Sequence, residues 1–424
     1  MTSRLALAAL LFVVVAVPVA GAQPATTATV SSTSETHVVD VDGGDYATIQ
    51  SAVDAADPGD TVRVMPGTYR ETVTLDADIT LVAPRGVTLD GSSLGDDTAG
   101  IEISGDASVV VERFTITGYT VAVDASGAGG DWTLLNTTIA DVGFIGVYAP
   151  WTTGDWRVSN VTVQDADTGV DAGRSTGDWV VSDAVVRNTS VGVQATASAG
   201  GWTLRRTTVE GTDAAGVEAM YTTGDWRVVN TAIRDTTVGI GALGATGNWS
   251  VKRSTVANAS DATGVDYWQP PLANGAGIDA SGTNGSWSVH RTRFVGNAAT
   301  IVADDTDPQG DATCNWFGDP VGPDAEDCTG NVDCSEPLDE WPPDPSERSA
   351  TATSPRTPDE TAPDVTTATQ TPYGTTPTAT PDAPTTTLAG PSTPTPTTTV
   401  VPLSPGLALV GTLLAGLVVA RRRR

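Results

Sequence analysis

Basic residues are scarce in this chain, and lysine is almost missing. The sequence has 22 Lys and Arg against 51 Asp and Glu, Lys252 is its single lysine, and the formal net charge is −29. Phosphate contacts need clustered Arg and Lys, so this balance excludes a nucleic-acid partner bound through a basic patch. Leu and Phe are also few, while Gly, Pro and Thr are abundant, which argues against a large helical domain.

Histidine, methionine and cysteine are equally rare. There are two His (His37 and His290), three Met and three Cys in 424 residues. No Ser or Cys is paired in the sequence with either histidine, so a nucleophilic triad is not supported. A copper site is not supported either, because no Cys/His cluster is present.

The two ends differ in composition from the middle. Residues 1–22 combine Arg4, an apolar run and Ala20-Gly21-Ala22, as in a secretory signal peptide. A linker is assigned to residues 23–38. Residues 345–402 are rich in Thr and Pro, which predicts a disordered, O-glycosylatable stalk. Residues 403–424 are apolar and end in four Arg, which predicts a hydrophobic anchor or sorting signal. We therefore expect an extracellular protein attached to the cell surface or membrane.

Tryptophan marks a repeat in the middle of the chain. Trp132, Trp156, Trp179, Trp202, Trp226 and Trp249 are 23 or 24 residues apart, and Trp287 follows after 38. A fixed period of this length is typical of a solenoid. The residue two positions after each Trp is aliphatic and the residue between varies, which is the period of a β-strand.

Two further aliphatic columns complete each repeat. One runs from Ile139 to Phe294, and the other runs from Val147 through Ile240 and Val265 to Ile301. Three short strands per coil of about 23 residues predict an all-β fold, a single-stranded right-handed parallel β-helix of about 10–11 coils over residues 39–344. The segment Thr48–Ala56 has one apolar face and is predicted to be a short N-terminal capping helix.

Motifs at both ends of the repeat resemble known proteins. Tyr46–Val53, Pro58–Val62 and Pro66–Glu71 are similar to the opening of pectin-lyase-fold proteins, including pectin methylesterases and NosD-type proteins. Cys314–Gly318, followed by Gly322-Pro323, resembles the closing motif of haloarchaeal surface β-helix proteins, and the acid excess resembles extreme halophiles. Ser404–Leu407 and the tail resemble the PGF-CTERM sorting signal, which implies replacement of the tail by a lipid. The resemblance implies the fold far more strongly than any one chemistry, because this fold carries lyases, hydrolases, esterases and non-enzymes.

A stripe of polar residues is expected on the outside of one sheet. It contains Asp171, Gln194 and Glu218 on successive coils, with Arg174 nearby, and Asp266 is expected to extend it. Two carboxylates about 10 Å apart suit an inverting pair of catalytic residues. The same Asp171 and Glu218 are candidate Ca²⁺ ligands, as in pectate lyases. The alternative is a solvated acidic stripe.

Aromatic residues suggest two different roles. The repeated Trp column shares the inward face with the aliphatics, which favours a stacked core over an exposed sugar platform. Trp151 and Tyr221 occupy one repeat position three coils apart, and Tyr267 and Trp268 lie in an inserted loop. These four are the candidate saccharide-binding residues, with loop packing as the alternative.

Covalent features follow from the extracellular location. A disulfide is expected among Cys314, Cys328 and Cys334, and the sequence does not select the pair. Of six Asn-x-Ser/Thr sequons, Asn136 and Asn160 are expected in a buried turn ladder. The four N-glycosylation candidates are Asn188, Asn248, Asn258 and Asn284.

These features favour a surface glycoprotein that binds polysaccharide or other cell-surface components. The competing interpretation is a carbohydrate-active enzyme of the pectin-lyase fold, and a third is a purely structural coat. No cofactor is implied apart from possible Ca²⁺.

Overall fold

The computed structural model describes residues 34–260, 272–319, 321–324 and 327–341. The chain divides into two units, Met1–Ala352 and Thr353–Arg424, and all described residues belong to the first. The predicted signal peptide, stalk and anchor, most of the linker and the loop containing Tyr267 and Trp268 lie outside the described residues. In the described part, no helix is both long enough and apolar enough to span a membrane.

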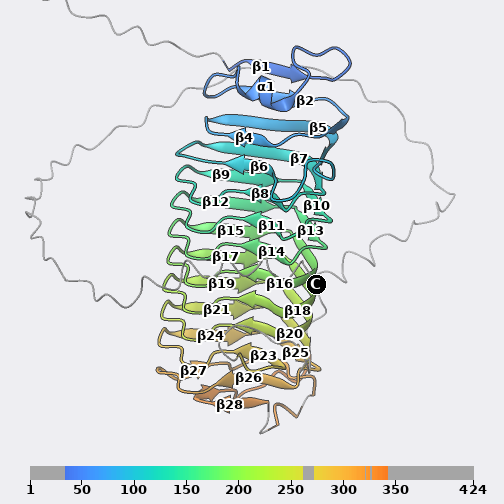
Figure 1. The fold of residues 1–424 in the computed structure, drawn as a ribbon. Helices are drawn as coiled ribbons and strands as arrows, with labels where there is room; N and C mark the ends of the chain where they lie inside the picture. Colours follow the sequence, from blue (N-terminus) through green and yellow to red (C-terminus); the bar gives the residue numbers. More distant parts are fainter. Residues whose placement is uncertain (1–33, 261–271, 320, 325–326, 342–424) are drawn as a thin grey trace, which may run out of the picture. The chain divides into compact units, whose positions relative to one another are not determined.

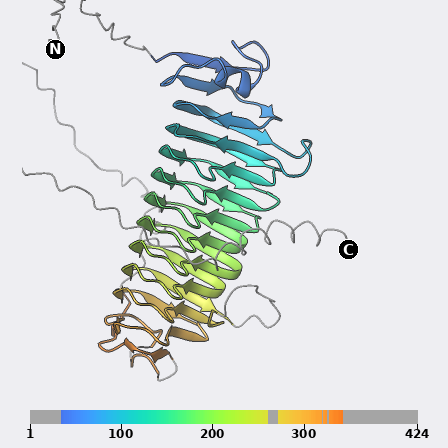
Figure 2. The ribbon, with the colours of Figure 1, turned by 60° about the vertical axis from the view of Figure 1, so that its left-hand side comes forward.

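The described chain is a right-handed parallel β-helix of about 12 turns, slightly more than predicted. Its coils stack from the N-terminal end, blue in Figure 1, to the C-terminal end, orange, and Figure 2 shows the same stack from a second side. Each coil contributes one strand to each of three parallel sheets. Away from the two ends of the stack, strands pair with their counterparts in the coils before and after, so the backbone hydrogen bonds run along the axis of the solenoid.

The sheet that contains the repeated tryptophans is called the Trp sheet. In register, its regular strands are β9 (Trp132–Leu135), β12 (Trp156–Ser159), β15 (Trp179–Ser182), β17 (Trp202–Arg205), β19 (Trp226–Val229), β21 (Trp249–Lys252) and β24 (Trp287–His290). Trp pairs with Trp along the whole series.

The middle sheet and the acidic sheet follow in each coil. The middle sheet contains β10 (Thr138–Ala140), β13 (Thr162–Gln164), the first halves of β16 (Val185–Gln194), β18 (Thr208–Glu218) and β20 (Ala232–Gly241), β22 (Thr255–Ala259) and β25 (Arg293–Val295). The acidic sheet contains β8 (Val121–Asp124), β11 (Ile145–Tyr148), β14 (Thr168–Asp171), the second halves of β16, β18 and β20, β23 (Ala276–Asp279) and β26 (Ala299–Ala303).

The Trp column is a stacked core, as predicted. The rings of adjacent coils lie 4.7–5.0 Å apart between centroids and are within 10° of parallel. All seven rings are at most 4% exposed. The indole nitrogens of Trp156 and Trp226 donate to Thr152 and Thr222, four residues earlier in the chain. The repeated Trp side chains therefore lie in the interior, and the sugar-platform alternative does not apply to them.

The N-terminal turns contain the motif residues, which serve the fold. Earlier strands are β1 (Thr36–Val39), β2 (Thr61–Val64), β3 (Thr68–Tyr69), β4 (Val73–Leu75), β5 (Ile79–Asp90), β6 (Ala99–Ile103) and β7 (Val109–Thr117). The predicted capping helix is α1 (Ile49–Val53), which buries Ile49, Ala52 and Val53. Glu71 accepts hydrogen bonds from the backbone of Ile49 and Gln50, so this motif residue caps the first turn of α1.

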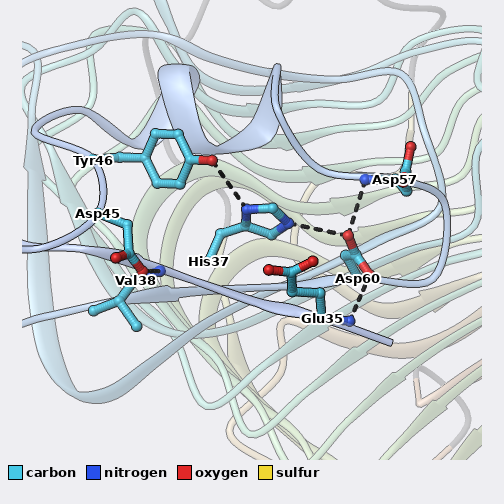
Figure 3. Close-up of polar contacts among 7 residues, drawn as sticks. All are labelled: Glu35, His37, Val38, Asp45, Tyr46, Asp57 and Asp60. Atoms are coloured by element: carbon cyan, nitrogen blue, oxygen red, sulfur yellow. Dashed lines mark hydrogen bonds and ion pairs between the residues drawn. The ribbon is translucent and has the colours of Figure 1, made fainter. Parts of the chain in front are cut away.

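A buried polar cluster fastens β1 to this cap (Figure 3). The ring of His37 lies between Asp60 and Tyr46, with Nε2 3.0 Å from Asp60 Oδ2 and Nδ1 3.3 Å from the Tyr46 hydroxyl. Asp60 also accepts from the backbone of Glu35 and Asp57. The Glu35 amide and then the His37 side chain hold the pKa of Asp60 below its usual value. His37 is thus part of a structural clamp, and β1 begins inside the predicted linker.

The last coils close with β27 (Gly310–Asp311), β28 (Cys328–Gly330) and β29 (Val332–Asp333). Cys328 and Cys334 form the disulfide, and Cys314 is free. Asn315 is fully buried and donates to the carbonyls of Val289 and Ala312. It satisfies backbone groups that the end of a solenoid would otherwise leave unpaired. The closing motif is therefore structural as well.

One assignment in the repeat was wrong. The aliphatic pattern predicts Val265 in the third apolar column, but Ile278 of β23 pairs with Ile240 of β20. Thr263–Asp266 and Ala276–Asp279 both read small-Gly-aliphatic-Asp, so the local pattern fits either segment. The insertion thus precedes the third strand of this coil, and Asp279 takes the place that Asp266 was expected to occupy.

Candidate functional site

The predicted polar stripe exists on the outer face of the acidic sheet. Tyr148, Asp171, Gln194 and Glu218 lie in register on four successive coils. Their Cα atoms are separated by about 4.8 Å per coil, the spacing of paired strands. On the inner side, a row of glycines leaves room for the close packing of the coils. Gly192 is one of them, because an added Cβ would collide with Val209 and with the carbonyl oxygen of Gly216.

Glu218 is the least accessible member of the stripe. It is 0% exposed, although its side chain is outside the apolar core. Its Oε1 accepts from the Thr196 hydroxyl at 2.7 Å and from Gln194 Nε2 at 3.4 Å. Its Oε2 has no hydrogen-bond partner among the described residues. Burial, opposed by these two hydrogen bonds, raises the pKa of Glu218, and the charge of Asp171 raises it further.

Asp171 and Tyr148 continue the stripe toward the N-terminus. Asp171 is half-buried, and its Oδ1 accepts from the backbone of Gly173 at 2.8 Å. Burial raises the pKa of Asp171, opposed by that hydrogen bond and by the charge of Arg174. Burial also raises the pKa of Tyr148, and the charges of Asp171 and Asp124 add to the effect. The stripe is therefore a partly dehydrated polar surface, unlike a solvated row of carboxylates.

Aromatic side chains border this surface. Trp151 and Tyr221 follow the acidic sheet at the same turn position and are 51% and 46% exposed. Both have positive φ, 57° and 56°, and each backbone N–H bonds to the next coil, at Gly173 and Leu243 respectively. Three coils separate them, about 14 Å. The backbone thus holds two exposed rings in line beside the stripe, as predicted from the sequence.

Arg174 lies between Trp151 and Tyr221 in the series of coils, and its guanidinium contacts the Trp151 ring. It occupies the turn position of Trp151 in the following coil, with φ of 59°. Its guanidinium carbon lies 5.8 Å from the centroid of the Trp151 ring, within range of a cation–π contact. No hydrogen bond between Arg174 and Asp171 is present in the described structure. Its guanidinium influences Asp171 through charge alone.

The C-terminal end of the stripe differs from the prediction. Leu272 packs over Gly241, the residue paired with Glu218 in the next coil. The backbone of Ala273 donates to Asp279 Oδ2, and that of Ser281 to Oδ1, so both oxygens of Asp279 are used. The apolar cover at Gly241 and the role of Thr196 were not foreseen. Thr196 follows Gln194 by two residues, and its reach to Glu218 depends on the stacking of coils.

The geometry argues against the predicted Ca²⁺ site. Asp171 and Glu218 are two coils apart, about 10 Å between backbones, and Gln194 lies between them. In the described part of the chain, no three His, Cys, Asp or Glu side chains converge in a way that could hold a metal ion. Calcium takes six to eight oxygen ligands, so these two carboxylates do not fit it.

All six sequon asparagines are exposed, including Asn136 and Asn160. The expectation of a buried ladder at these two positions was wrong. Asn160 Nδ2 donates to Asn136 Oδ1 at 2.7 Å, but the two side chains stack on the outside of a turn. Of the four predicted glycosylation sites, Asn188 and Asn258 donate to Asp165 and Asp235 of the preceding coil. Asn248 donates to Asp225, and Asn284 donates to the carbonyl of Gly282.

Known proteins resemble the chain in architecture. No protein-family model matches the sequence, and no curated protein matches it. Among solved structures, the Azotobacter vinelandii mannuronan C-5 epimerase AlgE6 A-module is 12% identical with a TM-score of 0.42, covering 68% of this chain and 92% of that one. The alginate lyase from Paenibacillus sp. str. FPU-7 is 14% identical with a TM-score of 0.38, covering 72% and 99%.

The pectate lyase Pel9A is 16% identical with a TM-score of 0.31, covering 79% of this chain and 88% of that one. All three are proteins named for polysaccharide-modifying activities. Similarities at this level do not transfer an activity to this chain, whose function has to be argued from its own residues.

Proposed function

We propose that this chain is a secreted, surface-attached β-helix protein that binds polysaccharide along the outer face of its acidic sheet. Trp151 and Tyr221 would stack on sugar rings, while Tyr148, Asp171 and Gln194 hydrogen-bond to hydroxyl groups. The supporting observation is the pair of half-exposed rings held in line beside a partly dehydrated polar stripe. Such surfaces, flat and apolar on one side and polar on the other, suit saccharides.

Attachment is part of the same proposal and rests on the sequence. The signal-like start would direct export, the Thr/Pro segment would act as a spacer, and the apolar tail with four Arg would anchor the chain or be replaced by a lipid. A binding module at the end of a spacer can reach polymers of its own or a neighbouring cell surface.

The inaccessibility of Glu218 places binding ahead of catalysis. A catalytic acid must come within hydrogen-bond reach of its substrate, and Glu218 is 0% exposed. Enzymatic cleavage is the second candidate, favoured by the raised pKa values of Asp171 and Glu218. Their backbones are about 10 Å apart, close to the carboxyl separation of inverting glycosidases.

The test is retention of the purified chain on a panel of insoluble polysaccharides in high salt. We expect the double variant Trp151→Ala/Tyr221→Ala to bind at least tenfold more weakly, since an aromatic ring stacked on a ligand contributes roughly 0.5–1.5 kcal/mol beyond its buried area. Phe144→Ala is the matched control, because Phe144 is 38% exposed on a different turn.

Unchanged retention of the double variant would contradict the binding proposal. Release of reducing or unsaturated ends by the wild-type chain, abolished in Asp171→Asn, would instead support the enzymatic candidate.

A further inference from the structure

A concave surface lies on the outside of the Trp sheet, away from the acidic stripe. It is a groove of about 510 Å³ that crosses five coils, β9, β12, β15, β17 and β19. Four inter-coil steps of about 4.8 Å give it a length of about 19 Å along the solenoid axis. We call it the Asp-ladder groove. Its polar and central lining residues are Asp131, Asp155, Asp178, Asp225, Arg157, Arg227, Val180, Gly201 and Thr203.

One wall of this groove is a ladder of carboxylates. The Oδ1 atoms of Asp131, Asp155 and Asp178 each accept the backbone N–H of the next coil, at 2.7–2.9 Å. Asp225 does the same for Asn248. The second oxygen of each of these carboxylates accepts no hydrogen bond from the described residues. The backbone therefore fixes each carboxylate in place and leaves one oxygen available to a ligand.

The ladder is interrupted at one coil. Gly201 stands where the neighbouring coils have Asp178 and Asp225, and it lies beside Val180 and Thr203 at the centre of the groove. Gly201 has no positive φ, and a Cβ added there would approach Asp178 Oδ1 to 3.1 Å. Backbone conformation therefore does not require glycine, and the missing side chain widens the groove.

The groove is also lined by two arginines. Arg157 and Arg227 are exposed, occupy one register position three coils apart, and are separated by about 14 Å. Neither forms a salt bridge or hydrogen bond with any described residue, whereas Arg206 pairs with Asp183 and Arg234 with Glu210. Donors and acceptors thus line the same open groove, with each Arg two residues after an Asp in the chain.

We infer that the Asp-ladder groove binds a second ligand, a neutral linear glycan strand that runs along the solenoid axis. Free carboxylate oxygens accept from sugar hydroxyls, the guanidinium groups donate to ring and glycosidic oxygens, and Val180 packs against a ring face. The coil spacing is close to the length of one hexose residue with its glycosidic oxygen. An extended peptide repeats every two residues, about 6.6 Å, and falls out of register with the coils.

The charge of the groove decides between neutral and anionic glycans. Four Asp face two Arg, so a uronate polymer would place its carboxylates against a wall of like charge. This inference is independent of the acidic sheet, because it uses another face and other residues. If both proposals hold, one molecule can connect two polymer strands.

The test uses the full-length chain with the Trp151→Ala/Tyr221→Ala changes, which silence the acidic-sheet site. Calorimetry with cellopentaose, penta-N-acetylchitopentaose and pentagalacturonate should show binding of at least one neutral pentamer, tighter than that of the uronate. Adding Gly201→Asn fills the centre of the groove with the side chain that continues the ladder at Asn248. Gly201→Asn should weaken binding at least tenfold. Arg157→Ala/Arg227→Ala should have an effect of the same size. Ser250→Ala, on the same sheet, is the matched control. Circular dichroism checks that each variant is folded.

Three results would overturn the inference: no neutral pentamer binds in the silenced background, the uronate binds more tightly, or the groove variants bind as well as their control. Failure of the acidic-sheet proposal has a different signature, since the Trp151→Ala/Tyr221→Ala changes would then leave binding unaltered in a chain whose groove carries Arg157→Ala/Arg227→Ala.

Discussion

At the scale of single residues, the most unusual group is the buried carboxyl of Glu218. Its Oε2 is without a partner in the described structure, and burial raises its pKa. A raised pKa in the folded state means that the folded chain holds this proton more tightly than the unfolded chain does. The group's contribution to stability is therefore fully present below the unfolded pKa of about 4.3 and is lost as the pH rises through the higher folded pKa.

Replacing Glu218 with Gln should accordingly stabilise the protein at neutral pH. We expect a gain of about 1 kcal/mol in the free energy of unfolding, the order of the cost of a buried unsatisfied polar group. The gain should shrink at pH 4, where the native side chain is protonated. Denaturant unfolding of both chains at pH 4 and pH 7.5 measures the difference. A loss of stability at pH 7.5, or an equal change at both pH values, would show that ionisation of Glu218 is not the cause.

Residue-level prediction from the sequence succeeded where the repeat itself carried the information. Trp151, Asp171, Gln194, Glu218 and Tyr221 were placed in their columns because period and spacing fix the register of each coil. Burial could not be read in the same way. The residues near Glu218 in the sequence do not predict its hydrogen bond from Thr196 or the packing of Leu272 over Gly241 on the adjacent coil. Both contacts arise from the stacking of coils.

At the scale of elements, the Trp stack has a neighbouring ladder of hydroxyls that is incomplete. Trp226 donates to Thr222, but the corresponding position for Trp249 is Ala245. The indole nitrogen of Trp249 is buried and has no hydrogen-bond partner in the described part of the chain. A buried N–H that gains a partner recovers part of its desolvation cost.

Ala245→Thr should therefore raise the free energy of unfolding by about 1 kcal/mol. The neighbouring coils accommodate Thr222 and Thr283 at this turn position, so a Thr side chain fits there. Thr222 accepts from the indole of its coil, whereas Trp287 makes no such bond to Thr283 among the described residues. Ala245→Val is the control, since it has the same branching without the hydroxyl. Thermal and denaturant unfolding compare the three chains. If Val stabilises as much as Thr, packing and not the hydrogen bond is responsible.

The glycine row behind the acidic sheet makes the opposite prediction. Gly192→Ala should destabilise the protein by about 1–3 kcal/mol, the usual cost of overpacking, because the new Cβ would meet Val209 and the Gly216 carbonyl. Gly86→Ala, where nothing lies within 4 Å of an added Cβ, should change stability little. Equal unfolding midpoints for Gly192→Ala and the native chain would show that the coils can shift apart there.

Local sequence patterns predict most strands of the repeat but do not always select the right segment. The strands that carry Trp were assigned correctly because the indole marks their first residue. The third strand of the coil with the insertion was assigned to the wrong segment, because Val265-Asp266 and Ile278-Asp279 have the same local pattern. Pairing with β20 selects the second, and pairing is a long-range property.

At the scale of the whole molecule, the acid excess predicts a dependence on salt. With a formal net charge of −29, repulsion between like charges opposes the compact state, and ions screen it with a Debye length of about 10 Å at 0.1 M and about 3 Å at 1 M.

We therefore expect the melting temperature to rise steadily as NaCl is increased from about 0.1 M to 1 M, over the range in which screening strengthens. Scanning calorimetry measures it, and sucrose at matched osmolality is the control for general solvent exclusion. A melting temperature that responds equally to sucrose and NaCl would argue that charge repulsion contributes little to the stability of this protein.

The seven parallel indoles have an optical consequence. Rings within 10° of parallel and 4.7–5.0 Å apart have transition dipoles close enough to interact, so ultraviolet light absorbed by one indole is shared along the column. Excitation can then migrate over several coils before it is emitted or quenched. The near-ultraviolet spectrum of this protein is thus a property of the stack, and a break at any one coil would divide the column into two shorter chromophores.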